Sequence, residues 1–172
     1  MLKQVIVAAA VAVCASPALA HVTLETQETP VSSGYKAVFR VPHGCKGAAT
    51  TAVRVKIPEG VIGVKPMPKA GWELKVVKGK YAKAYDLYHG SVSEGAKEIS
   101  WSGGMLPDEF YDEFVLQVYL SADLKPNTVI YFPVVQECAG GGTSRWIEIP
   151  AEGKKVGDYE SPAPGLRLLP KK

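Results

Sequence analysis

Histidine and cysteine are scarce in this chain of 172 residues, which has 3 of each and lacks the four-ligand spacing of a structural zinc site. It also lacks a Gly-rich phosphate loop and a Ser-His-Asp arrangement that predicted strand positions make plausible. Lys and Arg number 20 against 17 Asp and Glu, and the basic residues are spread along predicted strand faces. These absences argue against zinc modules, phosphate-loop enzymes, serine hydrolases and nucleic-acid-binding proteins.

Long apolar runs are absent except near the start of the chain. The run from Val5 to Val13 follows Lys3 and precedes Ala18-Leu19-Ala20, the small-x-small pattern after which signal peptidase cuts. This run is too short to span a bilayer. We therefore predict a cleaved signal peptide over residues 1–20 and a periplasmic mature chain without a membrane span. Removing 20 of the 172 residues leaves 152, enough for one domain with a sizeable core.

Of the three cysteines, Cys14 lies inside the predicted signal, so the mature chain keeps Cys45 and Cys138. A pair of cysteines in an oxidising compartment predicts a disulfide. Closing the segment between them, with a separation of 138 − 45 = 93 positions, is worth roughly 4 to 5 kcal/mol in a chain-entropy estimate. The alternative is a pair of reduced thiols that binds copper(I), with the imidazole of His43 nearby.

Helical periodicity is absent: no stretch has apolar residues at helical spacing over three turns, and we expect helix only as a turn near residues 107–111. Short β-rich runs recur with turn residues between them instead. The sequence therefore predicts an all-β fold, an immunoglobulin-like or cupredoxin-like antiparallel β-sandwich of about eight strands. The predicted strands are residues 35–41, 51–57, 72–77, 81–88, 99–102, 114–120, 129–135 and 144–149.

Two local patterns predict a hairpin within the sandwich and a tail after it. The Gly-containing link Lys78-Gly79-Lys80 predicts a hairpin between the third and fourth strands. After Pro150 the chain is rich in Gly, Pro and Lys, and Ser161-Pro162-Ala163-Pro164-Gly165 is typical of extended, poorly packed polypeptide. We therefore predict a domain over residues 21–155 and a C-terminal tail over residues 156–172.

His21 carries the most specific chemistry, because cleavage after residue 20 leaves its α-amine free beside its own imidazole. Amine and Nδ1 together close a six-membered chelate, and copper(II) is the divalent ion that such nitrogen donors bind most tightly. The chain His21-Val22-Thr23-Leu24-Glu25 alternates, so Val22 and Leu24 are expected to pack inward while His21 and Glu25 share the other face. A carboxylate on that face can supply an oxygen ligand.

Further motifs are individually weak but specific together, and they cover nearly the whole mature chain. They are His21-Val22-Thr23-Leu24, Arg40-Val41-Pro42, Lys65-Pro66-Met67-Pro68 with Gly71-Trp72, Trp101-Ser102-Gly103-Gly104 with Leu106-Pro107, Glu113-Phe114, Gln136 and Arg145-Trp146. In these motifs the chain resembles the YcnI-like copper-binding domains of bacterial exported proteins.

This resemblance implies a β-sandwich that binds one copper(II) ion per chain through a mono-histidine brace. The brace residue is then His21, and the nearby tryptophan is Trp146. An indole nitrogen carries a hydrogen and has no free lone pair, so Trp146 is expected to shield the ion or to lay its ring against it, a contact worth about 0.5 to 2 kcal/mol. Trp72 and Trp101 are expected in the core.

The acidic ligand stays open at this point. Glu25 is a candidate because of the strand alternation from His21, and Glu113 because of its place in the Glu113-Phe114 motif. Glu137 is a weaker third candidate because it adjoins Cys138. Any one of these carboxylates can equally be an ordinary solvated side chain.

The function expected from these residues is non-enzymatic. The chain is predicted to store copper(II) or to deliver it to another periplasmic copper chaperone or cuproprotein. One alternative is a copper-dependent polysaccharide monooxygenase, in which His43 or His89 completes a three-nitrogen site. Another is an adhesion or carbohydrate-binding sandwich in which His21 is incidental.

Overall fold

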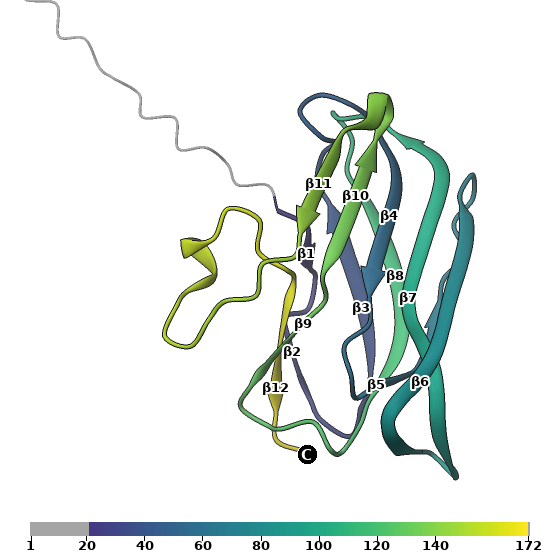
Figure 1. Ribbon diagram of the computed structural model, residues 1–172, viewed down its shortest axis with the longest axis vertical. Coiled ribbons are helices and arrows are strands. Elements are labelled where there is room, and N and C mark those ends of the chain that lie inside the picture. The colour runs from purple at the N-terminus through teal and green to yellow at the C-terminus, as the bar shows by residue number, and fades with distance from the viewer. Residues whose placement is uncertain (1–20, 172) are drawn as a thin grey trace, which may run out of the picture.

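The computed structural model describes residues 21–171, which form a sandwich of two larger β-sheets with a small third sheet beside them (Figure 1). The first sheet has the order β1-β3-β8-β5, formed by Thr23–Leu24, Ser33–Val41, Asp112–Leu120 and Val61–Pro66. The second has the order β11-β10-β4-β7-β6, formed by Thr143–Trp146, Val134–Cys138, Thr50–Lys56, Gly90–Leu106 and Glu73–Leu87. The third has the order β2-β12-β9, formed by Glu28–Pro30, Gly165–Leu169 and Val129–Tyr131.

This architecture confirms the predicted all-β sandwich. All pairs in the two larger sheets are antiparallel, and among the described strands only β2 and β12 pair in parallel. Helix within residues 21–171 is limited to the 3₁₀ turns η1 (Ala139–Gly141) and η2 (Val156–Asp158), and none of it is long or apolar enough to cross a membrane. The predicted helical turn near residue 107 is a simple turn, closed by the Phe110 amide donating to the Pro107 carbonyl at 3.1 Å.

The core forms where strand alternation points apolar side chains between the sheets. In β4, Val53 and Val55 are fully buried while Lys56 is exposed, as its alternation predicts. Trp101 is also fully buried, and its Nε1 donates to the Met67 carbonyl at 3.0 Å. The other largest fully buried apolar side chains come from all three sheets and the adjoining loops: Phe39, Phe114, Phe132, Leu24, Ile62, Ile99, Leu116, Leu120, Leu166 and Leu168.

The hairpin predicted at Lys78-Gly79-Lys80 is wrong. Residues 73–87 form the single strand β6, which pairs with β7 on both sides of residue 79, and the reversal comes at the two-residue turn Tyr88-His89. Gly79 lies opposite Gly95, beside register shifts of the pair, and the Tyr81 ring occupies the space that a Cβ at Gly95 would need. The glycines therefore mark a bulge with a close side-chain approach rather than a turn. Strand β6 is one of the two outer strands of its sheet, and β11 is the other.

The C-terminal tail predicted over residues 156–172 is also wrong. Within this segment β12 pairs with β2 and β9, and Leu166 and Leu168 are fully buried in the main core cluster. The sandwich therefore continues past the predicted boundary at residue 155, because the alternating Leu166-Arg167-Leu168 buries its apolar face. Residues 147–164 form the loop that leads into β12 (Figure 1).

Residues 21–171 form twelve strands rather than about eight. The strands β1, β2, β5 and β12 were not in the predicted set, and the predicted strands 72–77 and 81–88 are the single strand β6. The predicted strand 129–135 is divided into β9 and β10 around Phe132-Pro133. Proline lacks the N–H that a continuous ladder needs, which explains the division. The signal-peptide prediction falls on residues 1–20, outside the described residues.

Candidate metal site

Strand β1 fixes His21 at one edge of the sandwich. Its residues Thr23 and Leu24 pair with Arg40 and Phe39 of β3, and the Glu25 amide donates to the Val38 carbonyl at 3.0 Å. Val22 and Leu24 are 1% and 2% exposed, which confirms the predicted alternation and anchors the segment in the core. His21 therefore starts from a fixed backbone and projects on the other face of the strand.

The His21 side chain is half-buried and packs against Trp146. The two ring centroids lie 5.4 Å apart with the planes inclined at 57°. The Nε2 atom of His21 is buried, and no described residue forms a hydrogen bond with it. Since the hydrogen bond at one ring nitrogen normally fixes the tautomer, the described residues leave the imidazole uncommitted. A metal ion needs an unprotonated ring nitrogen, and in a chelate with the α-amine that nitrogen is Nδ1, not the buried Nε2.

Trp146 lies at the end of β11 and is 8% exposed. It therefore contacts His21, as predicted, and also belongs to the core. Its Nε1 donates to the Oε1 of Gln136 at 3.1 Å. The indole N–H is therefore engaged, and the tryptophan has only its ring to offer a metal ion near His21.

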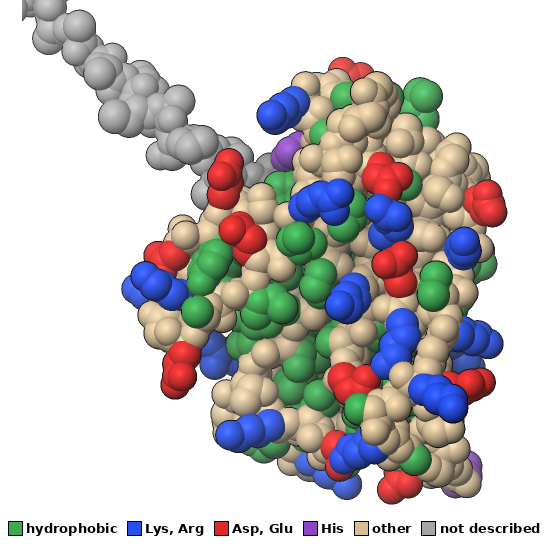
Figure 2. All heavy atoms as spheres, viewed as in Figure 1, with side chains coloured by type: hydrophobic (Ala, Val, Ile, Leu, Met, Phe, Trp, Pro, Cys, Tyr) green, Lys and Arg blue, Asp and Glu red, His purple; other side chains and the backbone are tan. Residues whose placement is uncertain are grey.

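A groove of about 250 Å³ opens beside His21. Its lining includes His21, Thr23, Tyr131, Arg167 and the stretch 162–165. Burial, followed by the charge of Tyr159, raises the pKa of Tyr131, so its hydroxyl stays protonated and is a poor copper(II) ligand at neutral pH. Figure 2 shows hydrophobic side chains gathering on the face between the loop of residues 147–164 and β9 and β10.

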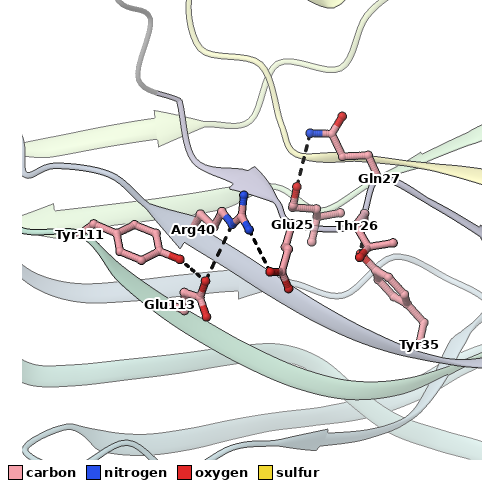
Figure 3. A network of polar contacts seen from close by, with 8 residues as sticks. Glu25, Thr26, Gln27, Tyr35, Arg40, Tyr111 and Glu113 are labelled. Carbon is pink, nitrogen blue, oxygen red and sulfur yellow. Dashed lines mark hydrogen bonds and ion pairs between the residues drawn. The ribbon is translucent and has the colours of Figure 1, made fainter.

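The predicted acidic ligands Glu25 and Glu113 are held together by Arg40, as Figure 3 shows. Arg40 Nη2 lies 2.9 Å from Glu25 Oε1, and its Nε lies 3.8 Å from Glu113 Oε1. The Tyr111 hydroxyl donates a hydrogen bond to the Glu113 carboxylate, and this hydrogen bond raises the pKa of Tyr111. The structure thus brings the two carboxylates to one cation rather than to His21.

Distance along β1 explains this separation. Four residues of extended chain span about 13 Å, so sharing a strand face does not bring the Glu25 carboxylate to the His21 ring. Glu113 faces Arg40 across β3 and β8, and Arg40 faces Thr23 rather than His21. Within residues 21–171, no three His, Cys, Asp or Glu side chains are grouped as a metal cluster.

The remaining predicted residues lie elsewhere. Cys45 and Cys138 form a disulfide with a Cα–Cα distance of 5.9 Å, which confirms the predicted pairing. Glu137 forms an ion pair with Arg54 at 2.6 Å. His89 is exposed in the turn between β6 and β7, as expected for it.

Gln136 and Arg40 are the residues whose roles sequence reasoning missed. Both stand in the motifs that carry the family resemblance, but nothing in the sequence shows that Gln136 contacts Trp146 or that Arg40 joins two glutamates. Their contacts connect different strands, so the pairing register of the sheets determines them.

Comparison with known proteins agrees with this fold. A family model described as a domain of unknown function (DUF1775) matches residues 21–168. A crystal structure of an uncharacterized protein from Nocardia farcinica, described as revealing an immunoglobulin-like fold, is similar to this chain with a TM-score of 0.63 and 27% sequence identity. That match covers 88% of this chain and 99% of the other. No curated protein matches the chain.

Proposed function

The chain belongs to the DUF1775 family, which is the YcnI-like family that its motifs predict, and we propose that it is an exported protein that binds one copper(II) ion at His21. The observation that carries the proposal is the placement of His21. Its ring is half-buried against Trp146, and it borders an open groove.

Each residue has a distinct part in this proposal. His21 supplies two nitrogen ligands, its α-amine after signal cleavage and its ring Nδ1. Trp146 covers one side of the imidazole with its ring and limits the access of water. Copper(II) is the cargo, and the groove leaves a path by which another exported copper protein can reach it. The proposed role is therefore storage of copper(II) or its transfer.

The carboxylate ligand is the part of the proposal with least support. For Glu25 or Glu113 to bind the same ion as His21, its ion pair with Arg40 has to break and its segment has to move. These two residues stay predictions, and the two His21 nitrogens form the core of the proposed ligand set.

Binding is proposed in preference to oxidation because the two other histidines have other places in the fold, His89 in the turn between β6 and β7 and His43 two residues before the bridged Cys45. The ring Nδ1 of His43 lies 2.5 Å from the carbonyl oxygen of Gly44. A three-nitrogen oxidative copper centre would need one of these imidazoles beside His21.

Adding one glycine before His21 is expected to weaken copper(II) binding by at least about a hundredfold, or about 2.7 kcal/mol. The added residue converts the amine into an amide and removes one of the two nitrogens. The measurement is a competition titration with a chelator, on proteins whose first residue is verified by mass spectrometry. The protein that begins at His21 should bind one equivalent.

His89→Ala is the matched control for this titration, because it removes an exposed imidazole in the turn between β6 and β7 and should leave the affinity unchanged. Urea unfolding of the extended protein should match that of the parent protein. Equal copper affinity with and without the added glycine would reject the proposed ligand set.

Lowering the pH should release the ion. An α-amine with an ordinary pKa of about 7.7 to 8.0 has to lose its proton before it binds metal. Below pH 7 each further unit should therefore weaken the affinity about tenfold through this proton alone. Chelator competition at pH 8, 7 and 6 measures the slope, and an affinity independent of pH over this range would mean that the amine is not a ligand.

A further inference from the structure

Gln136 is a fully buried polar residue at the centre of β10, directly behind Trp146. Its Oε1 accepts the hydrogen bond from Trp146 Nε1 at 3.1 Å. Its Nε2 donates to the carbonyl oxygen of His43 at 2.7 Å and lies 2.7 Å from Thr50 Oγ1. One amide thus connects the tryptophan of the candidate site to the segment at His43.

The chemistry of the partners allows only one orientation of this amide. A backbone carbonyl can only accept a hydrogen bond, and an indole N–H can only donate one. Turning the Gln136 amide by 180° would therefore place donor against donor at Trp146 and acceptor against acceptor at His43. A carboxylate at this position lacks the donor, and a methionine or leucine lacks both groups.

The hydrogen bond restricts the orientation of the indole ring. If Trp146 turned away, its buried N–H and the Gln136 carbonyl would lose their hydrogen-bond partners, which is unfavourable for buried polar groups. The same ring lies 5.4 Å from the His21 imidazole. The hydrogen bond to Gln136 therefore also fixes how the indole ring lies against His21.

We infer that Gln136 is a positioning residue for the copper site, which holds the Trp146 ring in place against His21 through the indole N–H. This inference rests on the proposed function, because it concerns the surroundings of the ion that His21 binds. Gln136 does not touch the metal. It acts only through Trp146, so its effect has to disappear when the indole N–H is absent.

A double-mutant cycle tests this dependence. Gln136→Met keeps the length of the side chain and removes both hydrogen-bonding groups, and it should weaken copper(II) binding about tenfold, as expected when an outer partner of a metal ligand is lost. It should also change the copper(II) electron paramagnetic resonance spectrum. In a Trp146→Phe background, which keeps an aromatic ring without an N–H, the same substitution should change neither affinity nor spectrum.

The matched control is Tyr85→Phe on the outer strand β6, which removes the hydrogen bond from Tyr85 to Glu59 and should leave affinity and spectrum unchanged. A measurement on the unaltered, copper-free protein covers the case in which Gln136→Met does not fold. The Nε1 hydrogen of Trp146 should exchange with deuterium slowly, because it is buried and hydrogen-bonded. Rapid exchange of this hydrogen would overturn the inference.

The outcomes separate the two proposals. If the unaltered protein with a free amine binds no copper(II), the proposed function fails and the inference fails with it. If that protein binds copper(II) but Gln136→Met binds it equally well with the same spectrum, only the role of Gln136 is overturned. Equal tenfold losses in the tryptophan and phenylalanine backgrounds would also overturn it, because Gln136 would then act by another route.

Discussion

A chain that ends at Pro164 should be unfolded at 25 °C. The truncation removes Leu166 and Leu168, both fully buried, and leaves β2 and β9 without the strand between them. Loss of a buried leucine side chain costs about 2 to 5 kcal/mol, so two such losses approach the 5 to 15 kcal/mol by which a typical domain is stable. The far-ultraviolet circular dichroism of the truncated chain should lack the β signal of the full-length protein.

Two controls separate the loss of the strand from the loss of chain length. A protein that ends at Leu169 keeps β12 and should unfold at the same urea concentration as the full chain. Arg167→Ala changes an exposed side chain of the same strand and should alter the free energy of unfolding by less than about 0.5 kcal/mol. A folded, cooperative chain ending at Pro164 would show that β12 is not part of the core.

Replacing both Cys45 and Cys138 by alanine should lower the free energy of unfolding by roughly 4 to 5 kcal/mol. The bridge closes a segment of 93 residues, and removing it gives the unfolded chain back the entropy of that large loop. Urea unfolding of the double variant and of the oxidised parent protein measures the difference. The midpoint should fall without loss of the β signal in the absence of urea.

The reduced parent protein is the control for the disulfide prediction, because it has the same side chains without the bond. Its free energy of unfolding should match that of the double variant within about 1 kcal/mol. A decrease smaller than about 1 kcal/mol in both proteins would contradict the loop-entropy estimate and would mean that other contacts hold the two cysteine segments together.

The strands and the inward-facing positions could be predicted where alternation is strong. Val53 and Val55 in β4 and the burial of Val22 and Leu24 are examples. The bulge at Gly79 could not be predicted, because the residue opposite it, Gly95, belongs to another strand. The tail was mispredicted because the Pro and Gly residues before Leu166 obscured a two-residue alternation that is present in the sequence.

The candidate site divides in the same way. His21 is found by its position after the predicted cleavage site, and Trp146 by its motif. Their contact joins segments 125 positions apart, which only the arrangement of the sheets determines. The carboxylates were the weakest prediction because alternation gives the face of a strand and not the distance along it. Arg40 adds a competing partner that the spacing of Glu25 and Glu113 does not indicate.

The outer strand β6 affects whether molecules of this protein associate edge to edge at high concentration. Its 15 residues present one edge to solvent, and such an edge is a template on which a second molecule can add a strand. Four lysines are distributed along it, and Figure 2 shows Lys and Arg side chains, with Asp and Glu among them, where β6 and β7 lie. Two such edges brought together would set like charges against each other and desolvate them. At high concentration the molecules are thus protected against joining into fibres along this strand.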